Sequence, residues 1–176
     1  MRFLETKLQG TFFIDPERRE DERGFFARVF CMEEFQAQGL ETRLVQCSIS
    51  FNRQKGTLRG MHFQASPFAE NRLVRCTMGA AYDVILDLRS GSSSFKQWLA
   101  IELSADNRRM VYVPRGFAHG FLTLENDTEI FYQMSEFYHP EAAQGVRWDD
   151  PAFSIHWPIP ISLISDKDLS YKDFNP

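Results

Sequence analysis

The chain is poor in cysteine and has no long hydrophobic run, and each scarcity narrows its functional class. Its three cysteines, Cys31, Cys47 and Cys76, are scattered without a Cys-x-x-Cys pair. We therefore expect free thiols in a reducing cytoplasm rather than disulfides. No apolar stretch approaches the ~20 residues of a membrane helix, and the segment MRFLETKLQG lacks the apolar core of a secretion signal. A net charge of −4 argues against bulk nucleic-acid binding.

Short segments rich in Val, Ile, Phe and Tyr, separated by turn residues, dominate what the sequence does contain. Its 176 residues are enough for one domain with a core, and they show no repeat and no boundary, so we expect one domain over 1–176. Only residues 31–39 predict a helix, and the chain becomes irregular after Pro140. This pattern predicts an antiparallel barrel or jelly roll. The predicted strands are 73–79, 80–89, 97–104, 108–114, 119–125 and 129–138.

The strand predicted at 80–89 carries two acids on one face. Because side chains alternate along a strand, Asp83, Ile85 and Asp87 point to the side opposite Tyr82 and Val84. Such a face suits the wall of a polar cavity, but an ordinary outward face fits the pattern equally well.

His62, in the segment TLRGMHFQ, allows three interpretations. A metal site needs at least three converging ligands, and the sequence offers only Gln64 and His119 as obvious companions. A core histidine bonded to the backbone is a second interpretation. The third is a proton-transfer base, which usually needs an orienting carboxylate, and Asp83 and Asp168 are the candidates.

The other histidines and the arginines are less informative. His139 and His156 stand beside prolines and are expected to be structural. The planar guanidinium of arginine suits phosphate, so a small anionic ligand is plausible, although a solvated surface explains the same residues. The arginines concerned lie among aromatic residues in the first half of the chain: Arg23, Arg28, Arg59, Arg72 and Arg75.

Several segments, in order and over about residues 11–168, resemble the dTDP-4-dehydrorhamnose 3,5-epimerase family, the RmlC-like cupins. The pairing of LRGMHFQ with PRGFAHGF is the most specific part of the resemblance. The usual cupin His-x-His has become His62-Phe63-Gln64, as in the metal-free members of this family. The other segments are DERGFF, RLVRC, YDVILDLR, LSADNRRMVYV, FYQMSEFY, GVRWDDPAFSIHWP and LISDKD.

The resemblance implies an all-β fold, a cupin-type double-stranded β-helix (jelly roll) with few short helices. It implies a homodimer that exchanges N-terminal strands, and an isomerase that needs no cofactor and no metal. The substrate would be a nucleotide-linked 4-keto-6-deoxyhexose inverted at C3, C5 or both, in deoxysugar biosynthesis.

By the same resemblance, His62 is the base, Asp168 orients it, and Tyr132 is the acid on the opposite face of the sugar. Arg72 stands where the family has a lysine that holds the ketone or enolate oxygen. Residues implied in substrate binding are Arg23, contributed by the partner subunit, with Gln46, Arg59, Gln64, Asp83, His119 and Tyr138.

Three departures from the family pattern alter the expected ligand contacts. Arg72 keeps the positive charge of the lysine but is bulkier and planar. Cys47 and Ser48 replace an acid and an amide, and Arg28 replaces an acid expected to contact the nucleobase. A sugar-nucleotide-binding cupin without activity, a ketoisomerase and a metal-dependent oxygenase are therefore alternative functions.

Overall fold

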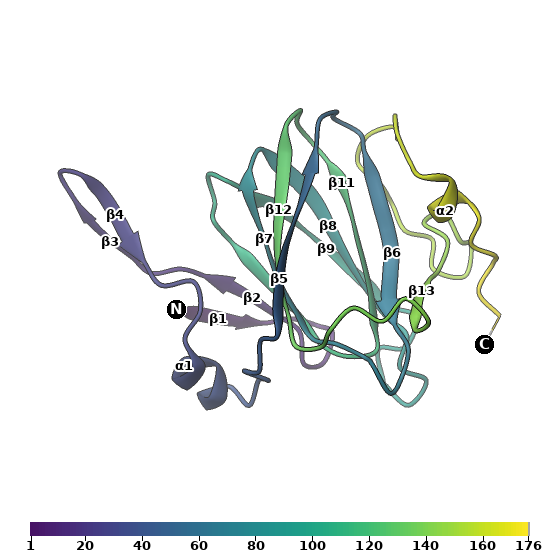
Figure 1. Ribbon diagram of the computed structural model, residues 1–176, viewed down its shortest axis with the longest axis horizontal. Coiled ribbons are helices and arrows are strands. Elements are labelled where there is room, and N and C mark those ends of the chain that lie inside the picture. Colours follow the sequence, from purple (N-terminus) through teal and green to yellow (C-terminus); the bar gives the residue numbers. More distant parts are fainter. Residues whose placement is uncertain (176) are drawn as a thin grey trace.

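Two antiparallel β-sheets face each other in the computed structural model, which describes residues 1–175 (Figure 1). The six-stranded sheet has the order β1-β2-β10-β7-β12-β5, and the five-stranded sheet has the order β13-β6-β11-β8-β9. The strands of the first sheet are β1 (Arg2–Glu5), β2 (Phe12–Asp15), β5 (Gln46–Asn52), β7 (Arg72–Met78), β10 (Met110–Val113) and β12 (Thr128–Met134). Those of the second are β6 (Leu58–Gln64), β8 (Ala80–Asp87), β9 (Trp98–Ser104), β11 (Phe117–Thr123) and β13 (Ala143–Gly145).

Three further elements lie outside the sandwich. A hairpin of β3 (Arg18–Asp21) and β4 (Gly24–Ala27) projects away from the sheets, as Figure 1 shows. Helix α1 (Met32–Ala37) follows the hairpin, and helix α2 (Asp166–Leu169) lies beside β6 near the C-terminus. Neither helix is long and apolar enough to span a membrane.

Apolar side chains fill both the space between the sheets and parts of their outer faces. Inward-facing residues of β7, β8, β9, β10, β11 and β12 form the central core, with Phe121 and Ile130 among its fully buried members. Helix α1 inserts Phe35 against the β2 and β10 end of the six-stranded sheet. The segment after β13 packs Phe153 and Ile155 onto the outer face of the five-stranded sheet, so both faces of this sheet are covered.

The all-β cupin prediction is confirmed, together with all six predicted strands and the helix within residues 31–39. The strand predicted at 129–138 ends at Met134, and the rest of that segment is a loop. The strands before residue 53, β6 and the short β13 were not among these six. Hairpin β3–β4 is too polar to give a hydrophobic alternation, because all four residues of β3 are exposed.

The two acids of β8 occupy different environments. Asp83 is completely buried and lies inside the sandwich, where it contacts His119. Asp87, at the end of the strand, accepts hydrogen bonds from Arg89, Ser92 and Ser94. Burial raises the pKa of Asp87, but these hydrogen bonds outweigh it and lower the pKa to about 2.

Replacing Asp87 by Asn is expected to destabilise the fold by about 3 kcal/mol at neutral pH, because Arg89 would lose its buried charge partner. The pKa of Asp87 in the folded chain is below that of the unfolded chain, so its contribution is complete above about pH 4. It is lost as the pH falls toward 2. Denaturant unfolding of both proteins between pH 7 and pH 2 checks this prediction. A difference in stability that stays constant over that range would contradict it.

Candidate active site

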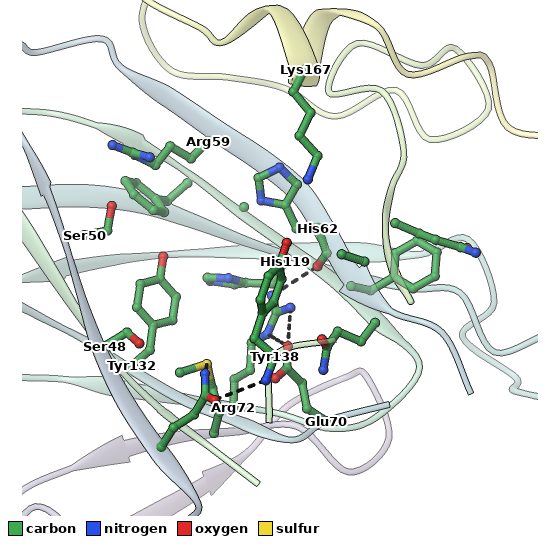
Figure 2. A pocket seen from close by; sticks show the side chains of 18 residues that line it. Ser48, Ser50, Arg59, His62, Glu70, Arg72, His119, Tyr132, Tyr138 and Lys167 are labelled. Atoms are coloured by element: carbon green, nitrogen blue, oxygen red, sulfur yellow. Dashed lines mark hydrogen bonds and ion pairs between the residues drawn. The ribbon is translucent and has the colours of Figure 1, made fainter. Parts of the chain in front are cut away.

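A cavity of about 450 Å³ lies between the two sheets (Figure 2). Strands β5, β7 and β12 supply one wall, and β6 and β11 supply the other. The residues that line it are Gln46, Ser48, Ser50, Arg59, His62, Phe63, Gln64, Glu70, Arg72, His119, Gly120, Phe121, Tyr132, Met134, Tyr138, Ala143, Gln144 and Lys167.

His62 is held by a carboxylate from the far end of the chain. Its Nε2 lies 2.6 Å from Oδ1 of Asp168, and the other oxygen of Asp168 accepts the main-chain N–H of Gly60 at 3.2 Å. Burial raises the pKa of Asp168, but the bonds from His62, Gly60 and Ser165 outweigh it, and the net shift is downward. An ionised Asp168 can only accept, so Nε2 carries the hydrogen and Nδ1 is left as a proton acceptor.

Glycine is required at position 60 to bring this strand close to its neighbour. The φ angle of Gly60 is +137°, and a Cβ atom there would lie 2.6 Å from the Cα of Gly120 on β11. The close approach pairs His62 with His119 across the two strands. The segment LRGMH therefore places the imidazole beside a second, buried histidine.

Tyr132 lies on β12, in the sheet opposite His62, and the two side chains line the same cavity. Its ring meets that of His119 edge to face, with the centroids 5.9 Å apart. Burial is the main cause that raises the pKa of the phenol, and the charge of Asp83 adds to it. Tyr132 therefore keeps its proton at physiological pH. Asp83 does not reach the cavity but holds Nε2 of His119 at 2.8 Å.

Three cations, Arg59, Arg72 and Lys167, line the cavity together with His62. Arg72 donates through Nη1 to the main-chain oxygen of His62 at 3.1 Å. Arg59 is tied through Nε to Oδ1 of Asn52 at 2.7 Å. Lys167 extends from α2 toward His62, as Figure 2 shows. Arg59, His62 and Lys167 also line an adjoining cavity of about 390 Å³ beside the C-terminal segment.

Two glutamine side chains fix the loop that carries Tyr138. Gln46 Oε1 accepts the N–H of Tyr138 at 3.1 Å. Buried Gln64 accepts the N–H of His139 at 2.6 Å and donates to the carbonyl oxygens of Phe68 and Phe137, each at 3.0 Å. Gln64 therefore links the loop of Phe68 to the loop of Phe137 and His139. Both the oxygen and the nitrogen of its side-chain amide bond to main-chain groups.

Replacing Gln64 by Ala is expected to lower the free energy of unfolding by about 2–4 kcal/mol, because three main-chain groups lose their partner. Denaturant unfolding measures the loss. Gln144 on β13 is a suitable control, since it is exposed and its side chain makes no hydrogen bond among residues 1–175. If Gln64→Ala and Gln144→Ala had equal free energies of unfolding, the hydrogen bonds of Gln64 would not contribute to stability.

The predicted site residues thus divide into three groups. His62, Arg72, Tyr132, Gln46, Arg59, Gln64, His119 and Tyr138 line the cavity, and Asp83 and Asp168 hold two of them from behind. Arg23 lies outside the cavity of its own chain, in the turn of the β3–β4 hairpin, where its side chain is 89% exposed and paired with Asp21.

Two of the departures noted in the sequence also point away from the cavity. Cys47 faces outward from β5, whereas Ser48 faces inward. Arg28 pairs with Glu34 of α1.

Sequence reasoning named Ser48 as an altered ligand contact, but it missed Ser50, Glu70 and Lys167 as residues that line the cavity. Alternation along β5 would have placed both serines on the face of Gln46, had this strand been recognised. No sequence signal distinguished Glu70 from a loop carboxylate. Among residues 1–175, no group of three or more His, Cys, Asp and Glu side chains could hold a metal ion.

Comparisons with known proteins agree with this geometry. Residues 5–176 match the family model described as dTDP-4-dehydrorhamnose 3,5-epimerase. The enzyme of that name from Methanothermobacter thermautotrophicus is 42% identical over 97% of this chain and 93% of its own. The crystal structure of the Elizabethkingia anophelis epimerase superposes with a TM-score of 0.96 at 38% identity, covering 99% and 96% of the two chains. A Legionella pneumophila enzyme in complex with dTDP-4-keto-L-rhamnose has a TM-score of 0.91 at 35% identity, covering 98% and 92%.

Proposed function

Because this chain belongs to the dTDP-4-dehydrorhamnose 3,5-epimerase family and is an epimerase of nucleotide-linked 4-keto-6-deoxyhexoses, we propose that His62 and Tyr132 are its proton-transfer pair. The supporting observation is that an imidazole and a phenol line one cavity from opposite sheets. Two groups so placed can act on opposite faces of a ring bound between them. Inversion of a carbon requires removal of a proton from one face and delivery to the other.

The reaction then follows from ordinary carbonyl chemistry. Nδ1 of His62 takes the proton from the carbon next to the C4 ketone, and the electron pair moves onto the ketone oxygen. Arg72 stabilises the resulting enolate, because a fixed cation in a partly dry cavity interacts strongly with developing charge. When the carbonyl re-forms, Tyr132 gives its proton to the opposite face of the carbon.

The diphosphate of the substrate would bind Arg59 and Lys167. Both cations line the main cavity and the adjoining one, so they lie where a nucleotide can extend outward while the hexose stays near His62. The Legionella enzyme, which binds dTDP-4-keto-L-rhamnose, supports a thymidine diphosphate sugar as the first substrate to test.

The homodimer is a proposal that rests on exposed apolar surface. Ile49 and Phe51 face outward from β5 and are 62% and 43% exposed, while the hairpin presents Phe26 at 71%. A second copy of the chain would cover these residues, and its hairpin would bring its own Arg23 to this cavity. Free Cys31, Cys47 and Cys76 support a reducing cytoplasm as the location.

Replacing Ile49 by Arg is expected to produce a monomer, because a guanidinium on this face would lose its water on association. Analytical ultracentrifugation measures the change, with Arg53→Lys as a control on an exposed position of the β5–β6 connection. A monomeric wild-type protein would contradict the proposed dimer.

The function itself is tested by incubating the enzyme with dTDP-4-keto-6-deoxyglucose and following the hexose by proton NMR. Epimerised product is expected, with new couplings at C3, C5 or both. Migration of the carbonyl to C3 would instead identify a ketoisomerase. No reaction with thymidine, cytidine or guanosine diphosphate sugars would contradict the epimerase proposal.

A further inference from the structure

Glu70 and Arg72 form an ion pair in the wall of the cavity. Nε and Nη2 of Arg72 both donate to Oε1 of Glu70, at 2.8 and 2.6 Å, and the two side chains are only 13% and 6% exposed for Arg72 and Glu70 respectively. The third hydrogen bond, from Nη1 to the main-chain oxygen of His62, fixes the guanidinium to the strand that carries the proposed base. The pair is therefore held in one orientation (Figure 2).

This pair retains both a donor and an acceptor for a ligand. A guanidinium has five N–H groups, and the three bonds above leave one on Nη1 and one on Nη2. All hydrogen bonds to Glu70 found among residues 1–175 end on Oε1, so Oε2 keeps its acceptor capacity. Because both residues line the cavity, a positive donor and a negative acceptor lie side by side at its surface.

We propose that Glu70 and Arg72 together recognise an α-hydroxyketone, so that the enzyme selects hexoses with a free hydroxyl at C3. This inference rests on the proposed function, in which Arg72 binds the C4 ketone oxygen. Of the two carbons beside that ketone in a 4-keto-6-deoxyhexose, only C3 carries a hydroxyl. Oε2 of Glu70 accepts the hydrogen of that hydroxyl while Arg72 donates to the neighbouring ketone.

The carboxylate is what makes this pair selective. A cation alone would accept any sugar with a ketone oxygen at this place. A buried carboxylate that has lost its water and finds no hydroxyl partner is destabilised. Sites built to bind a hydroxyl therefore strongly reject analogues that lack the hydroxyl. Glu70 is thus a specificity-determining residue, and the ion pair with Arg72 holds its carboxylate in position.

The test compares two substrates in D2O: dTDP-4-keto-6-deoxyglucose and its 3-deoxy counterpart. Deuterium exchange at C5 is followed, because that proton is present in both. Wild-type enzyme is expected to prefer the hydroxylated substrate at least ~100-fold in kcat/KM. In Glu70→Ala the preference should fall below ~5-fold, because the hydroxylated sugar loses its acceptor and the 3-deoxy sugar no longer leaves a carboxylate unpaired. Glu102→Ala, which removes an exposed glutamate of β9, should keep the wild-type preference.

Glu70→Gln guards against misfolding of the alanine variant, because it preserves the shape and removes the charge. Its preference should fall at least tenfold. Retention of the full wild-type preference in both variants would overturn the inference. If wild-type enzyme exchanged neither substrate, the proposed function would fail instead. Calorimetric affinities of the same two sugars would then test the pair directly, with Glu70→Ala again losing the discrimination.

Discussion

Replacing His62 by Asn is expected to reduce proton exchange and epimerisation about 1,000-fold, because the amide cannot accept the α proton at neutral pH. Nucleotide-sugar affinity should change less than tenfold, since Arg59, Arg72 and Lys167 remain. Single-turnover exchange in D2O and equilibrium binding separate the two effects. A variant that still exchanges the α proton at more than a tenth of the wild-type rate would exclude His62 as the base.

Replacing Asp168 by Asn tests whether this carboxylate sets the tautomer and orientation of His62. The amide introduced by this substitution can place its NH2 toward His62, which favours the tautomer with the hydrogen on Nδ1, so we expect a loss of about 100-fold. Asp166→Asn changes the same chemistry on an exposed residue of the same helix. That variant should retain wild-type activity.

Replacing Tyr132 by Phe is expected to separate exchange from inversion. The base side of the reaction is intact, so the α proton should still be lost to solvent and returned to the same face. Delivery to the opposite face should fall about 1,000-fold without the phenol. Comparison of deuterium content with product stereochemistry in a single reaction checks this expectation. If exchange and inversion fell by the same factor, Tyr132 would not act as a separate acid.

The strong hydrophobic alternation of the middle strands made much of the fold predictable. Strands β7 to β12 alternate because one of their faces packs into the central core. Hairpin β3–β4 escaped prediction because the exposed, charged residues of β3 give no alternation. Strand β5 does alternate, but its apolar residues Ile49 and Phe51 face outward instead of into the core, and the strand was not recognised. A polar hairpin that projects from the sheets has no hydrophobic periodicity by which a single sequence would reveal it.

The site was predictable where a motif carried it and unpredictable where long-range contacts built it. His62 and His119 belong to recognisable segments, and the structure places them on adjacent strands. Residue spacing alone left both Asp83 and Asp168 open as partners of His62, because 106 residues separate His62 from Asp168. The family resemblance favoured Asp168, and the structure places this carboxylate beside His62. The pair of Arg72 and Glu70 is local, since the two residues lie only two positions apart in the chain, but Glu70 lies outside the strand that begins at Arg72 and no motif singled it out.

The most direct test of the account is the isotopic content of the inverted carbon when wild-type enzyme works in D2O. Transfer through His62 and Tyr132 predicts that each inverted carbon carries deuterium from solvent. Inversion that retained the original hydrogen at that carbon would contradict proton transfer between the two side chains.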